Sequence, residues 1–192
     1  MKTINTYINE KLRLTNKHQY TCQPVNKYEL KSIIIERIKN EGNACDLNDI
    51  DTSKITDMSN LFDASKSKGH PLFKDFNGDI SMWDVSNVTD MVEMFFCCEK
   101  FNCDISRWDV SKVKDIYAMF FECKNFNCDL SKWTIPNVKG IPYMFYRCER
   151  FNCDLSKWDV SKVENMWFAF HDCPTQPDWY DKDKCEPIIN NI

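Results

Sequence analysis

The sequence predicts an α/β fold in which a 25-residue unit stacks into a short solenoid, each coil having one short parallel strand and one short helix. The first observation is a ten-residue motif, FNGDISMWDV from Phe76, that returns from Phe101, Phe126 and Phe151. The second is a change of apolar spacing within each unit, from a strand-like pattern to a helical one. A unit this short cannot bury its own apolar side, so neighbouring copies have to cover one another.

The first half of each unit predicts the strand. In the third full copy, apolar residues lie at Leu130, Trp133, Ile135 and Val138, which resembles the strand part of a leucine-rich repeat, L-x-x-L-x-L-x-x-N-x-L. Alternation then points Trp133 and Ile135 inward and Thr134 to solvent. The solenoid is therefore predicted to be of leucine-rich-repeat type. Its tryptophans are expected to lie in file, at Trp83, Trp108, Trp133 and Trp158.

The second half of each unit predicts a short helix. Val88, Met91, Met94, Phe95 and Cys98 fall on one helical face. The residue before the first helical position is a suitable N-cap in every copy, because it can accept or permit the exposed N–H groups of the first turn. These N-cap positions are Asp57, Asp90, Asp115, Gly140 and Asn165, and Pro142 then falls inside the first turn, where a missing N–H is tolerated.

The remaining segments are read as caps of the stack. NKYELKSIIIERIKNEG, from Asn26 to Gly42, has an apolar stripe, a capping asparagine and a terminal glycine, as expected of an N-terminal capping helix. Trp179 and Tyr180 are expected to fold over the last coil. The predicted organisation is an arm and capping helix at 1–42, a repeat region at 43–173 and a C-terminal cap or tail at 174–192. Within the repeat region, a degenerate repeat spans 43–66, an inserted loop about 64–75, and full repeats 76–100, 101–125, 126–150 and 151–173.

Composition limits the partners. The net charge of −4 and the pI of about 5.4 give no electrostatic reason to expect nucleic acid or an anionic membrane. No apolar run approaches the ~20 residues of a membrane-spanning helix. The first twenty residues contain no apolar core of a secretory signal. We therefore expect a cytoplasmic chain, or one that is exported by another route or is missing its original leader.

Eleven cysteines raise the question of disulfides or metal. Free cysteine packs as a small hydrophobe, and this is the favoured interpretation for the series on the apolar helix face. Disulfides between neighbouring coils and structural zinc stay open as alternatives. The helix-face series is Cys98, Cys123, Cys148 and Cys173, and a second series is Cys103, Cys128 and Cys153, with Gly78 in the first copy.

Two rows of aspartate also recur. Asp79, Asp104, Asp129 and Asp154 follow asparagines in a turn, where they are expected to satisfy backbone N–H groups; calcium is the alternative. The other row, on the strand, is expected to face outward, either as a solvated surface or as an acidic stripe that binds a partner. The candidate partner-binding residues are Asp84, Asp109, Thr134 and Asp159.

Enzymatic chemistry receives little support. The three histidines, His18, His70 and His171, lie in unrelated segments, and none recurs beside a nucleophile. Only four glycines are present, and no phosphate-binding loop or metalloprotease pattern occurs. We therefore expect no catalytic site, no metal site and no cofactor.

The motif FN-x-D-I/L-S-x-W-D-V-S-x-V, followed by D-M-x-x-M-F, resembles the BspA-like family of leucine-rich-repeat surface proteins, whose 25-residue unit also occurs in mycoplasma lipoproteins. The resemblance covers about Ala44 to Cys173 and implies a role in cell-surface attachment or protein binding. The expected function is a non-catalytic protein that presents a rigid surface to a protein or cell-surface ligand, through the strand face or the Asn60–Asp75 loop. An intracellular scaffold without an external ligand is the alternative.

Overall fold

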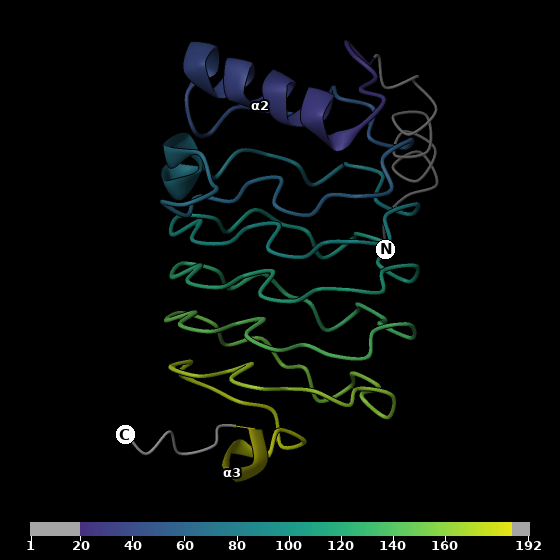
Figure 1. Cartoon of the computed structure of the whole chain (residues 1–192), viewed down its shortest axis with the longest axis vertical. Helices are drawn as coiled ribbons and strands as arrows, with labels where there is room; N and C mark the ends of the chain where they lie inside the picture. Colours follow the sequence, from purple (N-terminus) through teal and green to yellow (C-terminus); the bar gives the residue numbers. More distant parts are fainter. Residues whose placement is uncertain (1–19, 186–192) are drawn as a thin grey trace, which may run out of the picture.

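A computed structural model describes residues 20–185 of the chain. It contains the α-helix α2 (Lys27–Glu41), the 3-10 helix η1 (Pro71–Asp75) and the short helix α3 (Lys182–Cys185). Figure 1 shows a pile of coils between them, with α2 lying across one end and α3 at the other. The predicted position of His18 lies outside the described residues.

The predicted α/β solenoid of leucine-rich-repeat type is wrong. No residue from 20 to 185 belongs to a β-strand, and no coil contains an α-helix. Neighbouring coils share only isolated parallel bridges, such as Asp46 with Asp79 and Asp90 with Asp115. Each coil is built from consecutive turns instead.

The predicted helix does not form because its N–H groups donate to the next coil. The N–H groups of Met91, Glu93, Phe95 and Cys97 donate to carbonyls 24 residues further along, at 2.7 to 2.9 Å. The residues between them close tight turns, as where the Met94 N–H donates to Met91 O at 3.2 Å. Glu93 and Cys97 have φ of 52° and 60°, which no α-helix accommodates. Turns three residues apart thus give the same apolar spacing as a helix.

The predicted strand is replaced by two turns of five residues each. Asp79 Oδ1 accepts the Ser81 N–H at 2.9 Å, and the Trp83 N–H donates to Ile80 O at 3.2 Å. The next five residues, Asp84–Val88, repeat both bonds at 3.0 and 2.9 Å. Such Asx turns reverse the backbone locally. The chain therefore bends too often to remain extended.

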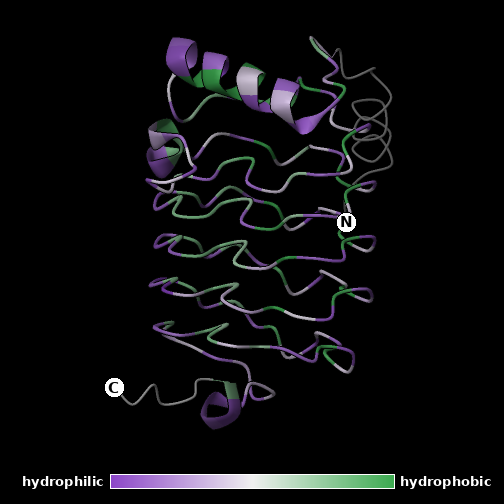
Figure 2. Cartoon of the chain, in the orientation of Figure 1, coloured by the Kyte–Doolittle hydropathy of each residue, from purple (hydrophilic) through white to green (hydrophobic). Residues whose placement is uncertain are grey.

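Aromatic rings fill the interior along the length of the stack. In the predicted file, Trp83, Trp108, Trp133 and Trp158 each donate the Nε1–H to a carbonyl of the preceding coil, at 2.9 to 3.2 Å, so the file is present. Phe76 and its equivalents in later copies stack at centroid distances of 5.9 to 6.3 Å. Figure 2 shows hydrophobic and hydrophilic stretches alternating along every coil.

Both ends of the stack are covered. The helix predicted from Asn26 to Gly42 is present as α2, and Asn26 Oδ1 accepts the first-turn N–H groups of Tyr28 and Glu29, both at 3.0 Å. At the other end, Trp179 donates its Nε1–H to Leu155 O at 3.0 Å, as the tryptophan of one further coil would. Tyr180 packs edge-on against Phe170, with ring centroids 5.0 Å apart.

The first junction explains two irregularities of the sequence. Trp83 bonds a carbonyl 36 residues earlier, whereas later tryptophans reach back 28 residues, so the first coil carries eight extra residues. The extra residues lie between Ala64 and Lys74, in the segment that leads into η1. The glycine that replaces cysteine at Gly78 is required here, because a Cβ would lie 2.6 Å from Cys45 O.

Candidate interaction surfaces

The predicted partner-binding residues all lie on the surface. Asp84, Asp109, Thr134 and Asp159 are exposed and occupy equivalent positions in successive coils. The three aspartates also shape the turns, because each accepts the N–H of the serine two residues on, at 3.0 Å. The hydrogen bonds from Ser111 hold the pKa of Asp109 below its ordinary value of 3.8. The turn hydrogen bonds thus fix the orientation of all three carboxylates.

Basic side chains flank both aspartate rows. Lys112 and Lys162 further lower the pKa of Asp109 and Asp159, as does Lys157 for Asp154. Basic neighbours therefore offset part of the negative charge of the predicted acidic stripe, at Asp109 and Asp159. We call these aspartates and their basic neighbours the polar rows.

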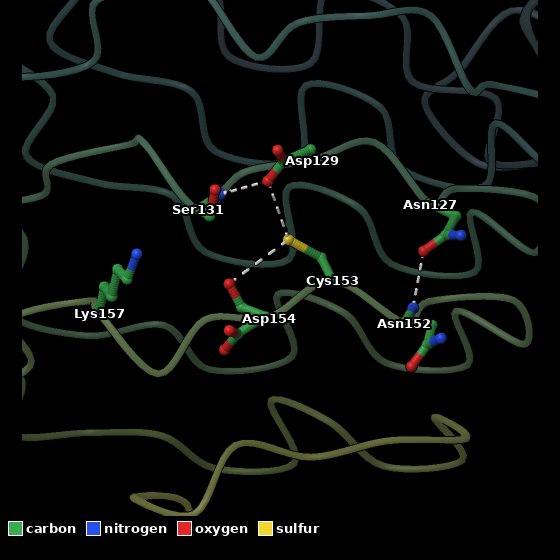
Figure 3. Close-up of a pocket in the computed structure, with 7 residues that line it drawn as sticks. All are labelled: Asn127, Asp129, Ser131, Asn152, Cys153, Asp154 and Lys157. Atoms are coloured by element: carbon green, nitrogen blue, oxygen red, sulfur yellow. Dashed lines mark hydrogen bonds between the residues drawn. The ribbon is translucent and has the colours of Figure 1, made fainter.

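A shallow pocket of about 350 Å³ opens between the last two repeats. Figure 3 shows the Cys153 thiol between the two coils, near Asp129 Oδ1 and Asp154 O, both at 3.8 Å. The same sulfur accepts the Leu130 N–H at 3.1 Å. Asn152 N–H donates to Asn127 Oδ1 at 2.7 Å, one step of an asparagine ladder that runs down the stack. Each of these polar groups already has a partner within the pocket wall.

These contacts explain why FNCD recurs. The phenylalanine stacks inside, the asparagine bridges coils, the cysteine closes the preceding turn and the aspartate forms its own turn. The prediction that the aspartates satisfy backbone N–H groups is confirmed. Among residues 20–185, no group of three or more His, Cys, Asp or Glu side chains is arranged to hold a metal ion.

Three free cysteines, Cys97, Cys103 and Cys128, have thiols that stay protonated. Burial raises the pKa of Cys103 and Cys128 to about 11 and that of Cys97 to about 12. In the helix-face series, Cys98, Cys123 and Cys148 are buried as predicted, and Cys173 is partly buried. Each of the four thiols donates to a carbonyl of a preceding coil, at 2.8 to 3.1 Å. A thiol that stays protonated is a weak nucleophile at neutral pH.

The two described histidines act in local packing. His70 Nδ1 accepts the Leu72 N–H at 3.3 Å and so caps η1. His171 stacks on Tyr146, with ring centroids 5.0 Å apart.

A surface of aromatic rings follows the turn segments. One column is a continuous stack, with Phe96 4.4 Å from Phe121, Phe121 4.7 Å from Tyr146, and His171 next. These rings are half-buried. Beside the column, Tyr117 is 38% exposed and Trp167 is 55% exposed, the largest exposure of any described tryptophan. We define the aromatic face as Phe96, Tyr117, Phe121, Tyr143, Tyr146, Trp167, Phe168 and His171.

Charged residues border the aromatic face. Arg147 bridges the neighbouring coils, with Nη1 3.1 Å from Glu122 and Nε 3.4 Å from Asp172. Its guanidinium also lies over the Tyr146 ring, 5.2 Å from the centroid. Lys124 Nζ lies 3.2 Å from Glu99. Exposed aromatics and arginine beside a charged rim are typical of protein interfaces.

Sequence reasoning missed the aromatic face. The signal was present, because Phe96, Phe121, Tyr146 and His171 recur every 25 residues. In the expected helix, the neighbouring Phe95 occupies the apolar side, and Phe96 has no place in the core. In a run of turns, adjacent residues point to the interior and the exterior, so both can form ladders.

Comparison with known families places the chain. Residues 32–70 and 67–179 match the family described as Mycoplasma protein of unknown function, DUF285. The chain belongs to this family. The finer resemblance to BspA-like leucine-rich-repeat proteins is not part of that match. No curated protein and no solved structure matches this DUF285 member.

The helices were also assessed as possible membrane spans. Within the part of this DUF285 member that the structure describes, no helix has the length and apolarity needed to cross a bilayer.

Proposed function

We propose that this DUF285 protein is a non-catalytic module that binds a protein partner through its aromatic face. The observation that carries the proposal is the pair of exposed rings, Tyr117 and Trp167, on a wall of half-buried aromatics. Exposed aromatic area surrounded by polar residues is the usual sign of an interaction site.

The stack supplies rigidity. Each coil is tied to the next along the turn segment by backbone hydrogen bonds of 2.7 to 3.0 Å, and the aromatic column packs ring on ring. Side chains fixed in this way lose little conformational entropy when a partner binds. The resemblance to BspA-like surface proteins supports a form of this function in which the partner lies on a cell surface.

The polar rows are the second candidate surface. Their carboxylates are equally well oriented, but partly offset charge offers less binding energy than desolvated aromatic area. The predicted contacts of a partner that binds through charged groups thus remain Asp84, Asp109, Thr134 and Asp159.

Two variants separate the surfaces. The first, Tyr117→Ser with Trp167→Ser, removes exposed rings. The second, Asp84→Asn with Asp109→Asn and Asp159→Asn, removes three charges but keeps the oxygen that accepts the turn hydrogen bond.

Immobilised wild type and both variants are compared for proteins retained from the source cell. We expect a protein that the wild type and the triple Asn variant retain and the double Ser variant loses. Loss from the triple Asn variant alone would move the site to the polar rows. Equal retention on all three baits would refute the proposal.

A further inference from the structure

The aromatic face has a charge pattern that is complementary to itself. Glu122 and Lys124 belong to one coil, and Arg147 and Glu149 occupy the equivalent positions in the next. The stacking of rings 25 residues apart shows that such positions lie in register along the stack. The sign therefore reverses from one coil to the next in both columns.

A second copy can meet the aromatic face in two orientations, which bring different side chains together. In the antiparallel one, a two-fold axis crosses the stack between these coils and lies in the interface, so each column faces itself with the coil order reversed. Glu122 then meets Arg147 of the second copy, and Lys124 meets Glu149. Symmetry repeats both pairs. All four contacts are attractive. A two-fold axis along the stack would instead keep the coil order and exchange the columns, so that Glu122 would no longer face Arg147.

The apolar residues fit the same arrangement. The outermost column of the face reads Val92, Tyr117, Pro142 and Trp167. Under the antiparallel axis the exposed indole of Trp167 comes over the smaller Val92, and Tyr117 comes over Pro142. Phe121 and Tyr146 lie at the centre. Bulky and small groups thus alternate across the interface.

We propose that the aromatic face binds a second copy of this chain, forming an antiparallel two-fold dimer. The inference rests on the proposed function, since it names the partner of the same surface. The face spans only four coils, so the contact is at the small end of specific interfaces, and the dissociation constant is expected to be on the order of micromolar.

Sedimentation velocity over a wide concentration range tests the dimer with the full chain. The wild type should shift from monomer to dimer, and Trp167→Ser should raise the dissociation constant about tenfold or more, as expected for an aromatic anchor. A wild type that stays monomeric, or a dimer indifferent to Trp167→Ser, would overturn the inference.

A charge exchange tests the orientation. Lys124→Glu and Glu149→Lys should each weaken self-association about tenfold, because each places like charges opposite one another. Mixed together they should form a heterodimer, since every facing pair is again opposite. Lys132→Glu, the same change in the polar rows, should leave the dimer unchanged. Failure of the mixture to associate would refute the antiparallel arrangement.

The same variants distinguish a failure of the dimer from a failure of the proposed function. If the chain is monomeric but the Tyr117→Ser, Trp167→Ser variant loses a captured protein, the dimer is wrong and the proposed function stands. If neither self-association nor capture responds to the aromatic variants, both are wrong.

Discussion

Replacing a single tryptophan of the internal file should reveal how tightly neighbouring coils are joined. Trp133 is 3% exposed, and its Nε1–H donates to Ile105 O, one coil back, at 3.1 Å. In Trp133→Phe this bond is lost. Ile105 O still accepts the Trp108 N–H at 3.1 Å, so the carbonyl is not left unpaired. The loss is therefore a net hydrogen bond, about 1 kcal/mol, with no added desolvation penalty.

The smaller ring adds a packing cost. A phenyl group leaves part of the indole volume empty, which costs about 1 to 3 kcal/mol depending on how far the neighbours relax. The free energy of unfolding should then fall by about 2 to 4 kcal/mol. For a chain of this length each kcal/mol lowers Tm by about 2 to 4 °C, so a shift of roughly 5 to 15 °C is expected.

Thermal unfolding followed by circular dichroism measures this shift, and the chain offers a matched control. Trp167→Phe is the same substitution at a tryptophan that is 55% exposed, so its Tm should stay close to that of the wild type. The reasoning would be refuted if Trp133→Phe lowered Tm by no more than Trp167→Phe does.

Three further outcomes follow from the turns and the thiols. Hydrogen bonds from Ser106 depress the pKa of Asp104 below 3.8, so its contribution to stability is present above that pH and is lost as pH falls through the lower, folded-state pKa; Asp104→Asn should flatten the acid limb of a plot of Tm against pH. Cys97, with a pKa of about 12, should react with a thiol-specific disulfide reagent at pH 8 more slowly than free cysteine, and all eleven thiols should react once the chain is denatured. Glu93, at φ 52°, should tolerate glycine, whereas Glu93→Val should cost about 1 to 2 kcal/mol in urea unfolding.

Much of the spatial order could be predicted from repetition alone. A 25-residue period with tryptophan and phenylalanine at fixed places implies that equivalent residues stack, and the rings of Phe101 and Phe126 do so. The N-cap at Asn26 was predictable because capping is a local interaction, in which the Asn26 side chain accepts two N–H groups of the first helical turn.

The secondary structure could not be predicted by the same reasoning. An aspartate that accepts the N–H two residues on serves equally as a helix N-cap and as the start of an Asx turn. Asp90 and Asp115 make this bond, at 2.9 and 3.0 Å, yet no helix follows either of them. The choice depends on whether the next N–H groups find partners within the segment or in the next coil. Only the assembled stack decides that.

The candidate site was predicted in part. The outward position of Asp84 was predicted from the alternation of inward and outward residues. Its neighbours in space come from other coils, so the basic side chains around the aspartates could not be predicted. The exposure of Trp167 was equally hidden, since its equivalents Val92, Tyr117 and Pro142 belong to three different residue types.

The direction of the bonds in the turn segment also bears on how such a protein can change in length. From Met91 to Cys97, the N–H donors point toward the following coil, and the carbonyls that accept them lie on the facing side of that coil. A whole 25-residue unit copied into the middle would meet matching partners above and below, whereas a fraction of a unit would leave a seam. The two ends of the stack are not interchangeable, because one presents carbonyls and the other presents N–H groups. Lys31 of α2 donates its Nζ–H to Asn60 O at 2.7 Å, so α2 fits the end that presents carbonyls. The repeat region can thus lengthen by duplication of entire units, while the caps at both ends of the stack stay the same.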